Sequence, residues 1–210
     1  RFVRDGYKLL HELGAVDGQQ QLTRMGRQLA RLPVDPRLAR MLLAASEMQC
    51  LKEVLVIAAA LEAMDPRERP LEKAQAADEK HALFRDERSD FYTYIRLWNA
   101  YAEQARHLSQ NKLRGWCRTH FLSFMRMREW IDVHRQLQAQ VHAIGFSSNS
   151  EDADYQSVHS ALLTGLLGNI AFQSEPGEYI GARNLKFVLF PGSGLSKKRP
   201  KWLMAAEVVE

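Results

Sequence analysis

Two short segments contain residue types that phosphate or metal chemistry uses. The glycine-rich segment Gly192-Ser193-Gly194-Leu195-Ser196-Lys197 could offer backbone amides to a phosphate. A phosphate-binding loop of an ATPase, however, ends in Lys-Ser or Lys-Thr and precedes a helix, and this segment has neither feature. The acidic segment Asp78-Glu79-Lys80-His81 follows polar, helical residues instead of the buried strand that would place a magnesium-binding box. We therefore expect neither a nucleotide-binding residue nor a catalytic residue in this chain.

The histidines and cysteines lack the spacing of metal ligands, and no nucleophile elbow of the Gly-x-Ser-x-Gly type accompanies them. His120 and His134 fall on a helical stretch rich in apolar residues, which favours structural roles. Cys50 and Cys117 both lie in apolar helical contexts. We expect buried thiols, a reducing cytoplasmic compartment and no metal site.

Basic residues are the remaining chemical signal, and they are grouped in blocks. The chain of 210 residues has a formal net charge of +4. Residues 181–201 contain six basic and no acidic residues, and residues 106–135 contain seven basic and two acidic residues. Lysine and arginine neutralise phosphates whatever the base sequence, so these blocks predict contact with a nucleic-acid backbone. The alternative is a solvated surface without a ligand.

Composition and periodicity predict a mainly α-helical protein. Apolar residues make up 46% and charged residues 26% of the chain, as in globular domains. Apolar residues nearly fill 38–64, which predicts helices buried on most sides at the centre of a bundle. Residues 111–144 predict one long helix or two abutting helices, with Met125 and Trp130 facing inwards. We expect Trp98 and Trp130 to be core anchors rather than base-stacking platforms.

Cap and turn residues divide the chain. Asp17-Gly18 favours a two-residue hairpin, and Thr23 caps the helix that follows it. Asp35-Pro36 begins the helical bundle. The polar stretch 147–154 predicts a domain boundary. Short extended runs with glycine-rich turns after residue 168 predict the beginning of a small β-barrel, which is not complete by the end of the sequence.

Three stretches are more specific than composition requires. The first runs from Leu13-Gly-Ala-Val-Asp17 through Leu22-Thr-Arg-Met-Gly26 to Pro33-Val-Asp-Pro36. The second is Trp116-Cys-Arg-Thr-His-Phe121, followed by Arg128-Glu-Trp130. The third runs from Tyr179 through Phe190-Pro-Gly-Ser-Gly194 to Trp202. In this order and spacing they resemble the C-terminal region of DEAH-box ATP-dependent RNA helicases of the bacterial HrpA type.

The resemblance implies an architecture and a division of labour. It assigns residues 1–33 to a winged helix, 34–146 to a helical ratchet (helicase-associated) domain, 147–151 to a linker and 152–210 to the first part of an OB-fold. In such helicases two RecA-like motor domains bind ATP and Mg²⁺ and move 3′ to 5′ along single-stranded RNA. The C-terminal domains close the RNA channel and couple RNA binding to ATP hydrolysis. ATP and Mg²⁺ are therefore implied for a longer parent protein, whereas this chain alone is not expected to be catalytic.

We expect a sequence-indifferent RNA-contacting surface on the barrel. Its predicted members are Arg183, Ser193, Lys197, Lys198, Arg199 and Lys201, with Arg114 and Arg118 as secondary candidates. The resemblance also implies contacts with the motor domains, and it leaves open DNA binding and a protein activator on the OB-fold. No membrane contact is expected. The alternative function is a stand-alone protein-interaction scaffold with no nucleic-acid role.

Overall fold

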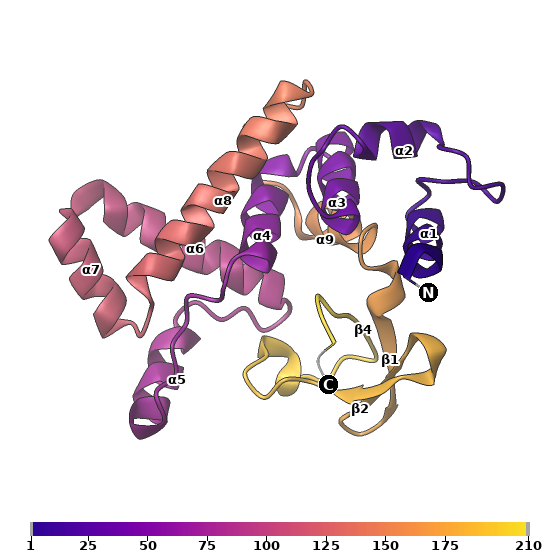
Figure 1. The fold of residues 1–210 in the computed structure, drawn as a ribbon. Helices are drawn as coiled ribbons and strands as arrows, with labels where there is room; N and C mark the ends of the chain where they lie inside the picture. Colours follow the sequence, from indigo (N-terminus) through magenta and orange to yellow (C-terminus); the bar gives the residue numbers. More distant parts are fainter. Residues whose placement is uncertain (1, 209–210) are drawn as a thin grey trace.

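The chain folds into a helical body followed by a small antiparallel sheet, which confirms the predicted fold class (Figure 1). This computed structural model describes residues 2–208, apart from the side chain of Arg183. The helices are α1 (Phe2–Glu12), α2 (Arg24–Leu29), α3 (Pro36–Glu47), α4 (Leu51–Glu62), α5 (Ala74–Ala82), α6 (Asp90–His107), α7 (Gln110–Thr119), α8 (Phe124–Ala143) and α9 (Tyr155–Leu163). Single 3-10 turns are η1 (Leu71–Lys73), η2 (Leu167–Asn169), η3 (Ala182–Asn184) and η4 (Gly194–Ser196), and the strands are β1 (Ile170–Glu175), β2 (Glu178–Gly181), β3 (Lys186–Val188) and β4 (Trp202–Met204). Over residues 2–208, no helix combines the length and apolar character needed to cross a membrane.

The hairpin between α1 and α2 is wider than the sequence predicts. A single bridge pairs Val16 with Leu22, and the Asp17 N–H donates to the Gln21 carbonyl at 2.9 Å, so residues 18–20 form the turn. The Asp17 carboxylate accepts hydrogen bonds from the backbone N–H groups of Gln19 and Gln21, both at 2.9 Å. These side-chain bonds add to the backbone pairing of Asp17 with Gln21 and hold a turn of three residues, so the predicted two-residue turn is wrong.

The predicted helix caps are present. The Thr23 hydroxyl accepts the N–H of Gly26 at 3.0 Å at the start of α2. The Asp35 carboxylate accepts the N–H of Arg37 at 2.8 Å, with Pro36 as the first residue of α3. Each cap satisfies an amide that has no partner within its helix.

Helices α3 and α4 lie at the centre of the helical body, where α4 packs against α3, α6, α8 and α9. Trp130 of α8 is fully buried, and its indole N–H donates to the Val56 carbonyl at 3.0 Å. The Trp98 ring of α6 meets the Trp130 ring edge-on, with centroids 5.2 Å apart. Trp130 is therefore a core residue, and the half-buried Trp98 packs against it.

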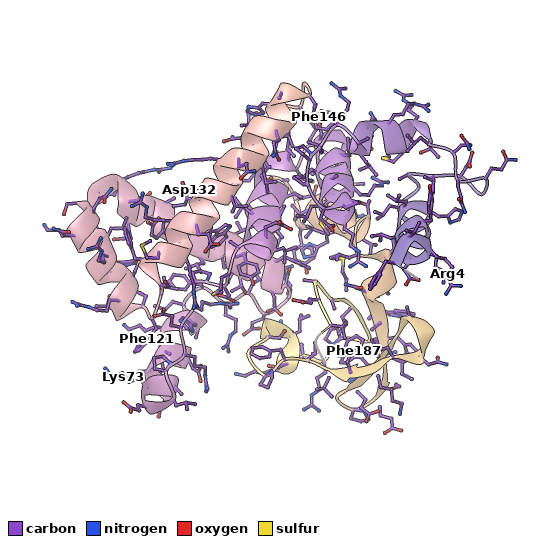
Figure 2. All side chains as sticks on the ribbon, viewed as in Figure 1. Arg4, Lys73, Phe121, Asp132, Phe146 and Phe187 are labelled. Atoms are coloured by element: carbon purple, nitrogen blue, oxygen red, sulfur yellow. The ribbon has the colours of Figure 1, made fainter. Side chains whose placement is uncertain are left out.

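A tight corner separates α7 from α8, so residues 111–144 form two helices. Phe121 has a positive φ of 53° at this corner, which lies beside α5 (Figure 2). Leu122 is buried and bridges Arg67, which holds the corner against the loop after α4. Because α8 begins a new helix after this corner, the inward-facing positions of α8 do not continue the pattern of α7. The prediction that Met125 faces inwards is wrong, since Met125 is 70% exposed.

Residues 147–154 are held against α4. The Asn149 side chain accepts the backbone N–H of Lys52 at 2.8 Å and donates to the Glu53 carboxylate at 2.9 Å. The same carboxylate accepts the Ala153 N–H at 3.1 Å. Helix α9 follows and packs on α3 and α4, so packing places α9 with the helical body rather than with the sheet.

The sheet has the strand order β3-β2-β1-β4, with antiparallel neighbours throughout. One face carries its own small core, in which Ala171, Tyr179 and Leu203 are buried and Phe187 packs against them (Figure 2). The Tyr179 hydroxyl donates to the Pro200 carbonyl at 2.9 Å and ties the segment before β4 to β2.

Candidate nucleic-acid interface

Three of the predicted basic residues lie exposed in the segment between η4 and β4. They are Lys197, Arg199 and Lys201. Within residues 2–208, none of the three forms an ion pair with a described carboxylate. Arg183 lies in η3, and its side chain is outside the described part of the chain. Lys197, Arg199 and Lys201 are called the basic segment below.

Lys198 differs from its neighbours because its charge has a partner. Its Nζ lies 3.1 Å from a carboxylate oxygen of Glu87, in the loop that precedes α6. Both side chains are more than half exposed, so the pair contributes little to stability. It does reduce the positive charge that Lys198 offers to a phosphate.

Ser193 is not among the exposed groups. It is 6% exposed, and its hydroxyl donates to Asp90 Oδ2 at 2.5 Å. The N–H of Gly194 donates to Asp90 Oδ1 at 2.8 Å. The hydroxyl and amide that were expected to approach phosphate are therefore used to fasten this loop to the start of α6.

Arg114 and Arg118 lie on α7, at the opposite end of the molecule from the sheet (Figure 1). Both are exposed, and the Arg114 guanidinium lies over the Phe124 ring, 5.2 Å from its centroid. The structure therefore does not bring these secondary candidates together with the basic segment.

An exposed row of side chains across the sheet was missed from the sequence. In the antiparallel register Trp202 faces Phe172, Phe172 faces Ile180 and Ile180 faces Lys186. Trp202 is 67% and Phe172 43% exposed. The sequence contains one indication of this row. Residues 170–172 and 202–204 are all apolar, so each of these strands must place an apolar side chain on both faces of the sheet.

The side chains that could bind a metal ion or act as a nucleophile are either hydrogen-bonded within the chain or buried. Asp78 lies on α5, where Nε and Nη2 of Arg69 donate to its two carboxylate oxygens at 2.7 and 2.9 Å. These hydrogen bonds lower the pKa of Asp78. Burial raises the pKa of the Cys50 thiol to about 12 and that of Cys117 to about 11, so both remain protonated at neutral pH. Residues 2–208 contain no group of three or more His, Cys, Asp or Glu side chains that could hold a metal ion.

The two helical histidines contact core aromatic residues. His120 Nδ1 lies 2.8 Å from the Trp116 carbonyl oxygen, and the two rings are 4.4 Å apart between centroids. The His134 ring lies 4.7 Å from the Trp98 ring, and burial lowers the pKa of His134. These contacts are those of packed structural side chains.

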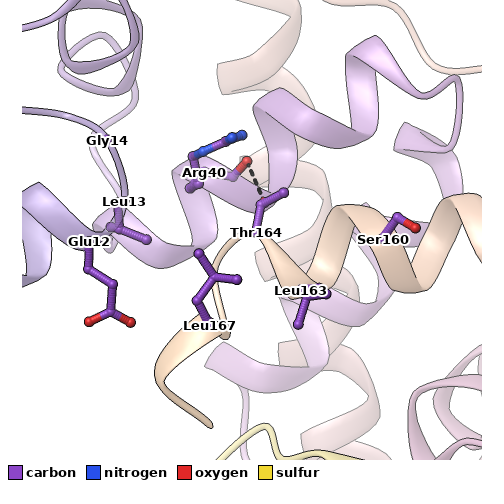
Figure 3. A pocket seen from close by; sticks show the side chains of 8 residues that line it. All are labelled: Glu12, Leu13, Gly14, Arg40, Ser160, Leu163, Thr164 and Leu167. Atoms are coloured by element: carbon purple, nitrogen blue, oxygen red, sulfur yellow. Dashed lines mark hydrogen bonds between the residues drawn. The ribbon is translucent and has the colours of Figure 1, made fainter. Parts of the chain in front are cut away.

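A pocket of about 320 Å³ lies between α1, α3 and α9 (Figure 3). The Thr164 hydroxyl at its wall donates within the chain, to the carbonyls of Ala161 at 2.7 Å and Arg40 at 3.3 Å. The pocket holds no paired acid and base. Its lining residues are Glu12, Leu13, Gly14, Arg40, Ser160, Leu163, Thr164 and Leu167.

A larger cleft of about 1090 Å³ lies between the helical body and the sheet. Its charged lining is mainly acidic, so the cleft itself does not favour a polyanion. The acidic residues are Asp35, Glu62, Asp65, Glu87, Asp90 and Glu207, against the basic Arg37, Arg88 and Lys198.

Two adjacent family matches cover residues 7–94. Residues 7–34 match the helicase associated domain (HA2), winged-helix, and residues 35–94 match the helicase associated domain (HA2), ratchet-like. Residues 7–94, matched by these two models, are called the HA2 region below. The second match begins at Asp35, the residue that caps α3.

Relatives extend the similarity beyond the HA2 region. The whole chain is 51% identical to the "ATP-dependent RNA helicase HrpA" of Escherichia coli (strain K12), and 49% identical to the HrpA homolog of Haemophilus influenzae. Over 99% of its length it is 29% identical to the "ATP-dependent RNA helicase DHX33" of Drosophila melanogaster. The chain spans 17% of the length of each bacterial relative and 30% of the fly relative.

Proposed function

We propose that this chain is the accessory region of an ATP-dependent RNA helicase and contacts single-stranded RNA through its sheet. The HA2 domains and the similarity to three RNA helicases support the parent activity. ATP hydrolysis belongs, in this proposal, to motor domains elsewhere in the parent protein. The chain helps to close the RNA channel and couples its occupancy to ATP turnover.

The observation that carries the RNA contact is the basic segment. Its three exposed cations have no partner among the described carboxylates, in contrast to Lys198. When an unpaired, exposed lysine or arginine contacts a phosphate, it displaces a counterion that was condensed on the RNA. This counterion release is the main source of affinity that does not depend on the base sequence. The acidic lining of the cleft directs the strand to the outer surface of the sheet rather than between the sheet and the helices.

We also assign the sheet to the first four strands of an OB-fold. The central strand β1 pairs with both β2 and β4, and β3 follows β2 at the other edge. Small barrels of this kind bind single strands on an exposed strand surface, and the basic segment leads directly into β4.

The experiment measures binding of the chain to two unrelated unstructured RNA oligomers by fluorescence anisotropy at several salt concentrations. A plot of log affinity against log salt has a slope of about −0.7 per phosphate contact on a single strand. The triple variant Lys197→Gln, Arg199→Gln, Lys201→Gln should flatten this slope by about two, equally for both RNAs. Lys198→Gln should change it less, because Glu87 already offsets that charge.

The matched control removes the same charge elsewhere. Lys8, Lys73 and Lys80 are exposed residues on α1, η1 and α5, and their triple change to glutamine should leave the slope unaltered. An equal slope for the basic-segment variant and the parent chain would overturn the RNA-contact proposal. Such a result favours the scaffold alternative, in which the basic segment only solvates the surface.

A further inference from the structure

The segment between η4 and β4 directs two neighbouring cations to different sides of the sheet. Lys198 lines the cleft between the sheet and the helical body, whereas the three residues of the basic segment are not part of that lining. Arg199 has a positive φ of 43°, which is uncommon for a residue other than glycine. Its Nη1 lies 3.9 Å from the position that a Cβ at Gly177 would occupy, in the turn between β1 and β2. Lys198 therefore faces the helical body, and Arg199 faces the hairpin of the sheet.

The loop 191–199 is attached at two points to the segment in which α6 begins. At the first point, Ser193 and Gly194 both donate to the Asp90 carboxylate, at 2.5 and 2.8 Å. At the second point, Lys198 Nζ lies 3.1 Å from Glu87. Ser193 is buried, whereas the side chains of Lys198 and Glu87 are 55% and 70% exposed. Since an exposed ion pair is open to competing ions, the second attachment is the one that a solute can release.

We propose that a phosphate of single-stranded RNA competes with Glu87 for Lys198, so that RNA binding and this attachment exclude one another. The inference rests on the proposed function and adds a regulatory contact to it. Lys198 lies between Lys197 and Arg199 in the chain, so a strand that contacts either neighbour brings a phosphate close to Lys198. Phosphate and carboxylate oxygens accept hydrogen bonds from the same ammonium group. Occupancy of the basic segment therefore loosens the attachment of the sheet to the start of α6.

The coupling between RNA and the Glu87–Lys198 pair is small and acts in both directions. An exposed ion pair changes an equilibrium by about fivefold at most. By linkage, the pair weakens RNA binding by the same factor by which bound RNA weakens the pair. Both effects can be measured, one on the RNA and the other on Glu87.

The binding experiment uses the whole chain, oligouridylate and fluorescence anisotropy at several salt concentrations. Glu87→Gln removes the charge and keeps the size of the side chain. RNA affinity at low salt should rise about two- to fivefold, because Lys198 no longer has to leave a partner. The plot of log affinity against log salt should become steeper by up to about 0.7, the value of one additional phosphate contact.

Two matched variants separate competition for Lys198 from general repulsion of RNA by negative charge. In the Lys198→Gln background, Glu87→Gln should have no effect, because the cation for which Glu87 competes is absent. Glu62→Gln removes an exposed charge at the end of α4, in the lining of the same cleft, and should leave both affinity and slope unchanged.

The reciprocal effect is read from the carbon-13 NMR signal of the Glu87 carboxylate, which is assigned by its loss in Glu87→Gln. Oligouridylate should move this signal towards the position that it has in Lys198→Gln. A signal that does not respond to saturating RNA would show that the pair stays closed when RNA is bound, and the competition would be rejected.

The binding outcomes distinguish the two proposals. If the basic-segment variant flattens the salt slope but Glu87→Gln binds RNA as the parent chain does, the phosphate surface stands and the competition is rejected. Weaker binding by Glu87→Gln would mean that the pair holds the loop in place for RNA, which also rejects the competition. A gain that persists in the Lys198→Gln background is general repulsion and rejects it too. If the basic-segment variant has no effect on RNA binding, both proposals fail.

Discussion

The carboxylate of Asp90 holds Ser193, which lies 103 residues further along the chain. One oxygen accepts the Ser193 hydroxyl at 2.5 Å, and the other accepts the N–H of Gly194 at 2.8 Å. A Cβ at Gly194 would lie only 2.0 Å from the backbone oxygen of Asp86, so glycine is required for this approach. The contact fixes the loop before the basic segment against the first turn of α6.

The first prediction concerns the strength of this contact. Ser193→Ala and Asp90→Ala should each lower the free energy of unfolding by about 1–3 kcal/mol, because hydrogen bonds to a carboxylate are stronger than neutral ones. Chemical denaturation of both single variants and the double variant gives the coupling energy. Hydrogen exchange should increase in residues 191–199 in both single variants.

The control for this cycle is Asp132→Ala. Asp132 is 66% exposed and, within residues 2–208, forms an ion pair only with Arg135 on its own helix, so the change should cost less than about 0.5 kcal/mol. Strict additivity of Asp90→Ala and Ser193→Ala would show that the two side chains do not support one another.

The second prediction concerns Trp130. Trp130→Ala should lower the free energy of unfolding by about 3–5 kcal/mol, because it empties a fully buried site and removes the hydrogen bond from the indole N–H to the Val56 carbonyl. Trp202→Ala is the matched control, since the same deletion at a 67% exposed position should cost far less. Equal costs for the two variants would contradict the placement of Trp130 in the core.

The third prediction concerns pH and His159 of α9. Its Nδ1–H donates to the Tyr155 carbonyl at 2.7 Å, and its Nε2 accepts the Ser89 hydroxyl at 2.7 Å. Burial lowers the pKa of His159 from its usual value of 6.5, and the positive charge of Arg88 adds to this effect. The hydrogen bond to Tyr155 and the negative charge of Asp86 oppose it.

The direction of the pH dependence of stability follows from how readily His159 binds a proton in the folded and in the unfolded chain. Below about pH 6.5 the unfolded chain binds a proton at this residue more readily than the folded chain does. Stability should therefore be independent of His159 well above pH 6.5 and should decrease as the pH falls below it. Denaturation at several pH values between 5 and 8 should show a smaller decrease for His159→Gln. An identical pH dependence in the two proteins would refute this account.

The fourth prediction concerns ATP. The purified chain should neither bind nor hydrolyse ATP above background, with or without RNA, because it lacks a phosphate-binding loop and Asp78 is paired with Arg69. Phosphate release and nucleotide titration test this directly. Turnover that persists through purification and disappears in the double variant Asp78→Ala, Glu79→Ala would contradict it.

Short-range features of this fold could be read from the sequence. The caps at Thr23 and Asp35 depend on hydrogen bonds to residues two or three positions away, so neighbouring residue types are sufficient to predict them. The apolar stretch of α3 and α4 likewise predicts burial on most sides, because periodicity along a helix determines which positions face the core. The basic blocks are equally visible, since charge is a property of composition.

Long-range contacts decided the rest. The corner at Phe121, the burial of Ser193 and the pairing of Lys198 with Glu87 each require a segment that is distant in sequence. The pairing of Trp202 with Phe172 likewise depends on the register of two strands that lie 30 residues apart. Residue type determined that this chain carries cations and aromatic rings, but only packing decided which cations stay unpaired and which rings stay exposed. The physical reason is that a side chain's exposure and partners are set by whichever segments the fold places beside it.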